Sequence, residues 1–147
     1  MGFTVDFTEF QKMCKEYENL QKEFNGFLRK FLVEMANRII RETKLKQSGH
    51  DPKFRAFDTG AMTAAWKLGA ITGSGRDISV EILNPMEYAT DIEFGHRIVV
   101  GKGQNKREVG WYQGKFMLTT SIDEIQKEMP ARFDSQFKAF CEQLGIK

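Results

Sequence analysis

A long apolar stripe at helical spacing constrains the fold of this chain more than any other feature. From Phe7 to Ile40, apolar side chains recur at steps that are almost all three or four residues, while Lys, Glu, Gln and Arg occupy the other face. The pattern predicts one helix over residues 7–43, about 55 Å long if it is unbroken. Gly26 lies inside it, but the stripe continues in phase, which favours a bend over a break. Asp6 is the expected N-terminal cap.

A second long helical pattern lies near the C-terminus. Apolar residues keep helical spacing both before and after Pro130. Because proline has no N–H and clashes with the preceding turn, the pattern predicts a kink or a restart there, and hence C-terminal helices within 115–145. Between the two helical regions, residues 44–57 lack periodicity and contain Gly49, which predicts a loop.

The segment between these regions, residues 58–114, is predicted to be a small α+β core with four strands. The strand segments alternate or are β-branched, and turn residues separate them. A tight turn at 73–77 joins the first pair, and a polar, glycine-rich tip at 101–107, expected to be mobile, joins the second. The predicted strands are 68–72, 78–83, 96–100 and the segment around 109–112.

A short helix near 59–66 is predicted, with Asp58 at its N-cap position. Asp58-Thr59-Gly60 also occurs in retroviral-type aspartic proteases, in which two such aspartates share a proton. That fold is all-β and has an apolar strand before the aspartate, whereas the charged Lys53 and Arg55 precede it here. The capping role is therefore the preferred interpretation. The residues expected to pack inward are Ala61, Met62, Ala65 and Trp66.

A second short helix is predicted over 85–94. Asn84 is its expected cap, Pro85 suits the first helical position, and Gly95 is well placed as the C-terminal stop. A strand is the alternative, because apolar residues between 88 and 94 also alternate.

Composition limits the class of protein. The 147 residues suffice for one domain, and 22 basic against 20 acidic residues give a formal charge of +2, too balanced for a protein that mainly neutralises phosphates. Phenylalanine supplies 13 aromatic residues, an apolar surface that favours self-association. No apolar run reaches the ~18 residues of a membrane span, and the two cysteines are expected to be free thiols in a reducing cytoplasm.

No group of residues predicts a catalytic site, a metal site or a cofactor. His96 lies close to Glu93, but zinc requires three or four ligands and no third is near. Lys102, Lys106 and Arg107 belong to a glycine-rich segment without the spacing of a phosphate-binding loop. They mark either a flexible tip or a loop that contacts a partner.

Three short motifs follow one another in a fixed order. They are Asp58-Thr59-Gly60 with Trp66, Asn84-Pro85 with Tyr88, Glu93 and Gly95, and Phe116-Met117 before the last helix. This order resembles the tail-component family of long-tailed bacteriophages and their prophage remnants, which includes tail-completion and head–tail joining proteins. The resemblance covers nearly the whole chain, and divergence is expected over 101–114.

The resemblance implies a non-enzymatic virion protein of the tail or neck, made in the cytoplasm of the bacterial host. Family members are thought to form a ring, often a hexamer, at the head-proximal end of the tail. The implied partners are further copies of the chain, the tail tube protein and a head-completion or neck protein, with no membrane partner. The motif residues then have structural roles, as helix caps, stops and core anchors.

These patterns together predict a single α+β domain over residues 1–147. Long N- and C-terminal helices are expected to pack on a small antiparallel sheet. The alternative function is a DNA-contacting neck or packaging-associated protein whose basic residues at 102, 106 and 107 touch DNA. The near-neutral charge argues against strong binding of that kind, so DNA contact is expected to be incidental.

Overall fold

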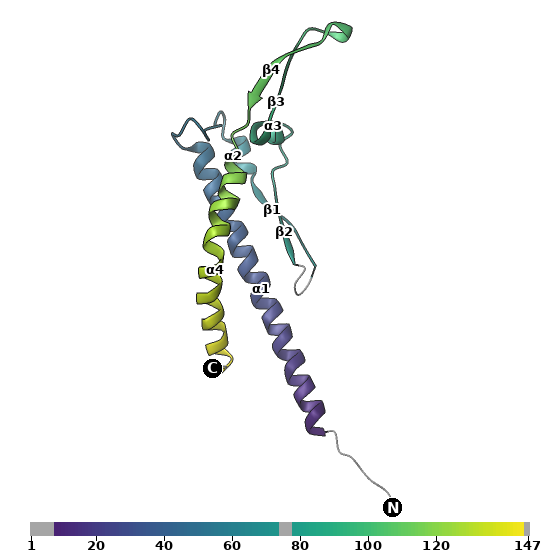
Figure 1. Ribbon diagram of the computed structural model, residues 1–147, viewed down its shortest axis with the longest axis vertical. Helices are drawn as coiled ribbons and strands as arrows, with labels where there is room; N and C mark the ends of the chain where they lie inside the picture. The colour runs from purple at the N-terminus through teal and green to yellow at the C-terminus, as the bar shows by residue number, and fades with distance from the viewer. Residues whose placement is uncertain (1–7, 74–77, 146–147) are drawn as a thin grey trace, which may run out of the picture.

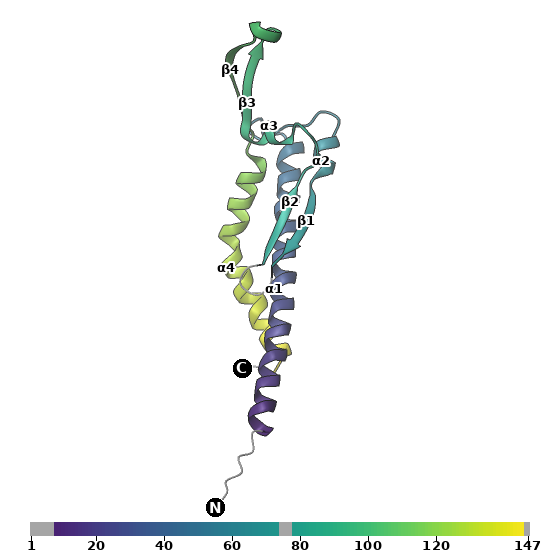
Figure 2. The same cartoon turned by 90° about the vertical axis from the view of Figure 1, so that its right-hand side faces the viewer.

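Two long helices run side by side and define an elongated molecule (Figure 1). In the computed structural model, which describes residues 8–73 and 78–145, α1 spans Thr8–Ser48 and α4 spans Met117–Gln143. Both views show the N-terminal turns of α1 extending past the end of α4 (Figure 2). Strands and short helices lie between them in the sequence, so the predicted α+β class is confirmed.

Helix α1 is longer than its apolar stripe predicted. The loop expected over 44–57 is wrong for residues 44–48, which form the last helical turn. The stripe is followed at four-residue steps by Thr43 and Gln47, which are both fully buried. Because these inward side chains are polar, the hydrophobic pattern ends before the helix does. The predicted cap Asp6 lies outside the described residues.

Gly26 lies within the unbroken helix α1, as its sequence pattern indicated. A Cβ atom at this position would meet nothing within 4 Å. Because glycine in a helix interior costs about 0.5–1 kcal/mol relative to alanine, we expect Gly26→Ala to raise the free energy of unfolding by that amount. Urea denaturation measures the change. A lower free energy of unfolding for the variant would contradict the prediction.

An aromatic seam joins α1 to α4. Neighbouring ring centroids within it lie 4.7–6.4 Å apart. Phe27 stacks on Phe140 at 4.7 Å, and Phe31 meets the edge of Phe133 at 5.4 Å. Six of the 13 phenylalanines therefore pack inside the chain, which accounts for part of the excess that the composition assigned to self-association. The six are Phe24, Phe27, Phe31, Phe133, Phe137 and Phe140.

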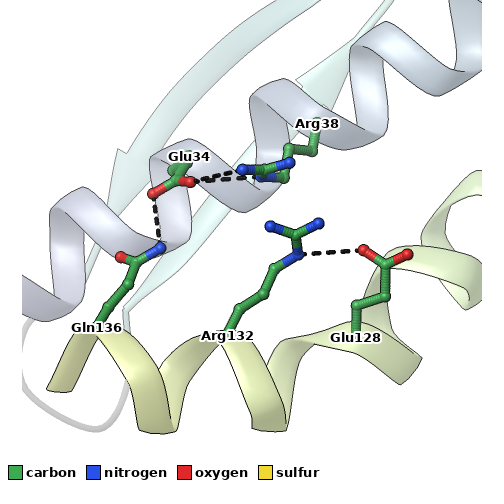
Figure 3. A network of polar contacts seen from close by, with 5 residues as sticks. All are labelled: Glu34, Arg38, Glu128, Arg132 and Gln136. Atoms are coloured by element: carbon green, nitrogen blue, oxygen red, sulfur yellow. Dashed lines mark hydrogen bonds and ion pairs between the residues drawn. The ribbon is translucent and has the colours of Figure 1, made fainter. Parts of the chain in front are cut away.

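A polar network also connects the two helices (Figure 3). The Gln136 amide donates to Oε2 of Glu34 at 3.1 Å, and the other oxygen of Glu34 pairs with Arg38 at 3.1 Å. On α4, Arg132 and Glu128 form a second pair four residues apart, also at 3.1 Å. Exposed ion pairs contribute only about 0.2–1 kcal/mol each, so the network specifies the register of the helices more than it stabilises them.

Helix α4 continues through Pro130, so the predicted restart and the expectation of two C-terminal helices are wrong. Pro130 is exposed, and water can therefore pair with the carbonyl that loses its N–H partner. Ile125 before the proline is buried, and Met129 and Phe133 on either side of it pack against the same core cluster. Tertiary packing of this face thus outweighs the local cost of the proline.

The strands form two separate antiparallel ribbons rather than one sheet. β1 (Lys67–Thr72) pairs with β2 (Ser79–Leu83), and this ribbon lies along α1. β3 (Gly95–Val100) pairs with β4 (Arg107–Gln113), and a short 3-10 turn, η2 (Gly103–Asn105), closes its tip. The second ribbon projects beyond the helices (Figure 1). The four predicted strands are confirmed. The prediction that they form one sheet packed on both helices is wrong, because they form two separate pairs, with α3 between the pairs in the sequence.

The short helices begin later than the capping patterns predicted. α2 spans Ala61–Ala65 and α3 spans Ala89–Phe94, so the strand alternative for 85–94 is wrong. Ala89 is buried, and its N–H donates to the carbonyl of Met86 at 3.1 Å. As predicted, α3 ends at Gly95.

Asn84 has a different role from the predicted cap of α3. Its Oδ1 accepts the N–H of Met86 at 3.1 Å, which closes a turn within the segment that also contains Pro85. Its Nδ2 donates to the carbonyl of Met62 at 2.8 Å. Asn84 therefore holds α2 against the chain that leads into α3, and Pro85 precedes that helix instead of starting it.

The buried core has two clusters that share neighbours. Ile82 and Leu118 pack against both of them. We therefore propose that the chain is one cooperative domain, and we expect far-UV circular dichroism and tryptophan fluorescence to report one coincident thermal transition. Two separate transitions would contradict a single domain. The clusters are Ile40, Met62, Trp66, Ala89 and Met117, and Phe31, Met35, Ile39 and Ile125.

Some predictions fall partly outside the described ranges 8–73 and 78–145. Of the turn at 73–77 only residue 73 is described, and the side chain of Cys14 is not. Cys141 is a half-buried free thiol. Within those ranges, no helix is both long enough and apolar enough to cross a membrane.

Candidate functional site

Several motif residues meet where the β3–β4 ribbon joins the helices (Figure 1). The chain passes from α3 into β3 and returns from β4 into α4, so the α3–β3 connection and the β4–α4 connection lie against each other there. The Lys115 N–H donates to the Ile92 carbonyl at 2.8 Å, and the Phe116 N–H donates to the Glu93 carbonyl at 3.0 Å. This ribbon junction is defined as residues 92–95 and 114–119.

Glu93 caps helix α4 from a distant part of the sequence. Its side chain is 2% exposed, and its carboxylate accepts the Leu118 N–H at 3.1 Å and the Thr119 N–H at 2.8 Å. The Thr119 hydroxyl donates to the same carboxylate at 3.0 Å. A negative charge at a helix N-terminus also interacts favourably with the helix dipole. Glu93 therefore fixes the start of α4 against the end of α3.

Two glycines allow these two connections to approach each other closely. Gly95 has a φ of +87°, and a Cβ there would meet the Tyr112 carbonyl. A Cβ on Gly114 would lie 2.5 Å from the Glu93 carbonyl oxygen and 2.7 Å from the Gly95 nitrogen. Because these neighbours are backbone atoms, only glycine permits so close an approach. Sequence reasoning placed Gly95 at the end of a helix but missed the role of Gly114, for which the sequence holds no local signal.

Phe116 and Met117 begin α4 in an unusual way. Phe116 has a φ of +50°, the left-handed region that side chains other than glycine seldom adopt. Its ring meets the edge of Phe94 at 6.1 Å. Met117 follows as the first helical residue and is fully buried in the core. The strained turn thus directs Met117 inward, while the Phe116 ring packs against Phe94.

Trp66 anchors α2 to the end of α1. It is buried, and its indole N–H donates to Oε1 of Gln47 at 2.7 Å. The Gln47 side-chain amide donates to the Ala56 carbonyl at 3.1 Å. Sequence reasoning identified Trp66 as a core anchor but missed Gln47. Its spacing of four residues from Thr43 and eight from Ile39 is the signal that could have found it.

Asp58 does not cap α2, which corrects the sequence prediction. The helix begins at Ala61, the capping position is held by Gly60 at a φ of +84°, and among the described residues the Asp58 side chain makes no hydrogen bond to the start of the helix. The Thr59 hydroxyl oxygen accepts the Ala61 N–H at 3.3 Å instead. Ala61, expected to face the core, is exposed. The Phe57 ring lies 3.1 Å from the position of a Gly60 Cβ, so the chain folds back over the glycine.

A groove of about 720 Å³ lies beside the ribbon junction. Loop 52–60, α2, α3 and the base of β4 form its walls. Its basic groups are already engaged, because Arg55 donates to the Ser48 carbonyl at 3.0 Å and to the Gly49 carbonyl at 2.6 Å, and Lys115 donates to the Pro52 carbonyl at 3.1 Å. We call this hollow the face groove, and its other lining residues include Phe57, Asp58, Thr59, Tyr88 and Tyr112.

The β3–β4 ribbon exposes apolar side chains on both faces. Trp111 is 56% exposed, Val109 is 52% exposed and Val99 is 51% exposed. In the described part of the chain, no helix or strand covers either face of the ribbon, and at its base His96 stacks on Tyr112 at 5.0 Å. Extended apolar surface on a projecting element is typical of a protein that acts through contacts with other chains.

The basic residues named from the sequence lie at the far end of the ribbon. Lys102 precedes the tip turn, Lys106 follows it, and Arg107 begins β4. All three are exposed. Over residues 8–73 and 78–145, no group of three His, Cys, Asp or Glu side chains is arranged to hold a metal ion.

Residues 11–95 match the family described as "Bacteriophage HK97-gp10, putative tail-component". The match spans more than half of the 147 residues, so the chain belongs to this family, and the resemblance drawn from the motifs is confirmed. No curated protein and no solved structure matches the chain.

Membership of this family makes the protein a structural component of a bacteriophage tail, with a place in the virion. The matched residues end at Gly95. They include the Asp58 motif, Trp66 and the Asn84–Gly95 motif. Apart from Gly95, the first residue of β3, the β3–β4 ribbon lies beyond them, and so does the Phe116-Met117 motif.

Proposed function

We propose that this tail component completes the tail, or joins it to the head, by forming a ring of copies at the head-proximal end. The uncovered β3–β4 ribbon is the observation that carries the proposal. A closed ring needs two different surfaces on each subunit, one that fits the other on the next copy. The β3–β4 ribbon offers such surfaces, because within the described residues no helix or strand covers its faces or its outer edges.

The elongated shape supports partners at both ends of the molecule. The ribbon lies at one end, and the N-terminal turns of α1 extend beyond α4 at the other (Figure 2). A helix without a packing partner is marginal in water, so these turns are stabilised when a neighbouring chain covers them. The proposed neighbours are the tail tube protein and a head-completion or neck protein, which the chain meets after its synthesis in the host cytoplasm.

Deletion of the gene from its phage or prophage tests this function. We expect electron microscopy of the lysate to show separate heads and tails, because the joining step is missing. Supplying the full chain should restore joined particles, and Lys127→Glu, an exposed change on α4, should restore them equally well. Joined particles without the chain would contradict the proposal, as would the absence of tails altogether, which would place the chain earlier in assembly.

A DNA-contacting neck protein is the second candidate. The observation in its favour is the exposed basic tip with Lys102, Lys106 and Arg107. Phosphate contacts weaken steeply with salt, so a DNA mobility shift measured at rising salt tests it directly. A shift that persists at physiological salt and disappears when the three residues are replaced by glutamate would favour this function over ring formation.

A further inference from the structure

The β3–β4 ribbon has two unpaired outer edges. In the described part of the chain, β3 pairs only with β4, and β4 pairs only with β3. The outer edge of each strand therefore presents a row of backbone N–H and C=O groups without strand partners. Both views show the ribbon projecting beyond the helices, so no other helix or strand lies along either edge (Figures 1 and 2).

The sequence of the ribbon does little to protect these edges. Soluble proteins usually protect a free edge with lysine, proline, a bulge or a covering element. Neither strand contains lysine or proline. One bulge lies at the register shift between Ile98 and Val99, and Arg97 is the one Lys, Arg, Asp or Glu residue of β3. The outer part of β3 is otherwise β-branched and exposed, as is typical of a strand that another strand accepts as a neighbour.

The β1–β2 ribbon is stabilised in a way that the β3–β4 ribbon is not. Leu68 of β1 and Ile82 of β2 pack against the buried core, and the β1–β2 ribbon lies along α1. No described residue of β3 or β4 belongs to either core cluster. A two-stranded ribbon alone is marginally stable in water, whereas three or more strands with an apolar face are stable. Additional strands would therefore stabilise the β3–β4 ribbon.

We propose that β4 of one copy pairs with β3 of the next copy, antiparallel, so that neighbouring ribbons join into one continuous sheet. Unpaired backbone groups along a sheet edge recognise an extended strand. Each copy supplies one edge of each kind, six residues long in β3 and seven in β4. A row of copies therefore uses both edges of every ribbon, and closure into a ring leaves no edge free. A strand from the tube or neck protein would leave the other edge unpaired.

Charge supports the pairing of unlike edges. Arg97 and Glu108 lie on the same face of the ribbon, because Glu108 pairs with Val99, two residues along β3 from Arg97. Their side chains are 72% and 55% exposed, and the atoms Nε and Oε2 lie 3.8 Å apart. In a continuous sheet, Glu108 of one copy shares a face with Arg97 of the next, and opposite charges on neighbouring strands stabilise their pairing. Arg107, the other charged residue of β4, lies on the opposite face. Two paired β3 edges would offer Arg97 no carboxylate.

The strand pairing rests on the proposed ring function and specifies its interface. The edges of β3 and β4 are different surfaces of the same chain, so the contact is heterologous and repeats from copy to copy. Two β3 edges, or two β4 edges, would instead form an isologous contact that stops at a dimer. The aromatic seam and the core take no part in the pairing, because both are used within the chain.

Photocross-linking in assembled particles tests the pairing. The full chain carries p-benzoylphenylalanine in place of the exposed Val99, and irradiated particles are separated on a denaturing gel. We expect a band at twice the 17.0 kDa mass of the chain, with mass spectrometry placing the adduct in residues 107–113 of a second copy. Adducts with β3 or the face groove of a second copy would overturn the pairing, and so would adducts with a tube or neck protein alone.

Hydrogen exchange provides a measurement that depends on the backbone. In an isolated ribbon about half of the amides point away from the partner strand and exchange freely. When the chain enters the particle, we expect the number of protected amides in β3 and β4 to rise about twofold, because the outer amides gain partners. The amides of β1 and β2 should not change and serve as the internal control. Unchanged exchange of β3 and β4 in particles that contain the chain would overturn the pairing.

Two matched substitutions of Val100 complete the test. In the photoreactive background, Val100→Lys should reduce the dimer band about tenfold, which corresponds to about 1.4 kcal/mol, because lysine opposes edge pairing. Val100→Thr keeps the β-branched shape and should leave the band within about twofold of its original intensity. Equal bands for the two variants would overturn the pairing. Joined particles that contain the chain but give no β3–β4 adduct would overturn the pairing and leave the ring function in place, whereas joined particles without the chain would contradict both.

Discussion

Replacing Glu93 by alanine should lower the free energy of unfolding by roughly 1–3 kcal/mol, because the Leu118 and Thr119 amides and the Thr119 hydroxyl lose their acceptor in a partly buried site. The loss of a negative charge at the N-terminus of α4 adds to this cost. Urea denaturation of both proteins measures the difference. Hydrogen exchange should also quicken at the first turn of α4, where the unpaired amides lie.

Two further variants separate the capping role from the removal of a large side chain. Glu93→Gln keeps the shape of the side chain but turns one acceptor into a donor, so this variant should be less stable than the native protein and more stable than Glu93→Ala. Glu87→Gln, on an exposed side chain, should change the free energy of unfolding by about 0.5 kcal/mol or less. A Glu93→Ala protein as stable as the Glu87→Gln protein would refute the cap.

Gly114→Ala is the other substitution with a large expected effect. Its Cβ would lie 2.5 Å from two backbone atoms, the Glu93 carbonyl oxygen and the Phe94 carbonyl carbon, and neither can withdraw without opening the ribbon junction. We expect the free energy of unfolding to fall by about 3 kcal/mol, the upper end of the usual range for overpacking. Because the junction holds the ribbon, the amides of β3 and β4 should exchange faster than those of β1 and β2.

Gly103→Ala is the matched control for this prediction. Gly103 has a φ of +59°, yet a Cβ there would meet nothing within 4 Å. Its substitution therefore incurs only the cost of the left-handed conformation, about 1–2 kcal/mol. Equal losses for the two variants would show that close backbone approach at Gly114 is not the reason for glycine there.

The local pattern of the sequence located the long helices and all four strands. Apolar spacing reports which face of a segment is buried, and this is a property of neighbouring residues along the chain. The pattern predicted the end of α1 too early because the inward residues Thr43 and Gln47 are polar. It also predicted a break at Pro130, where packing against α1 keeps α4 continuous. The order of the short motifs also identified the family, because recognising that order requires no knowledge of the contacts that the residues make.

The sequence by itself therefore determined the α+β class, the two helices and the family of phage tail components. Only the tertiary structure decided what the motif residues do. Glu93 caps a helix that begins 24 residues later, and Trp66 bonds to Gln47 across 19 residues. Asp58 lines a groove instead of capping α2. Such roles depend on which distant segments pack together, and periodicity carries no information about contacts between segments that are far apart in the chain.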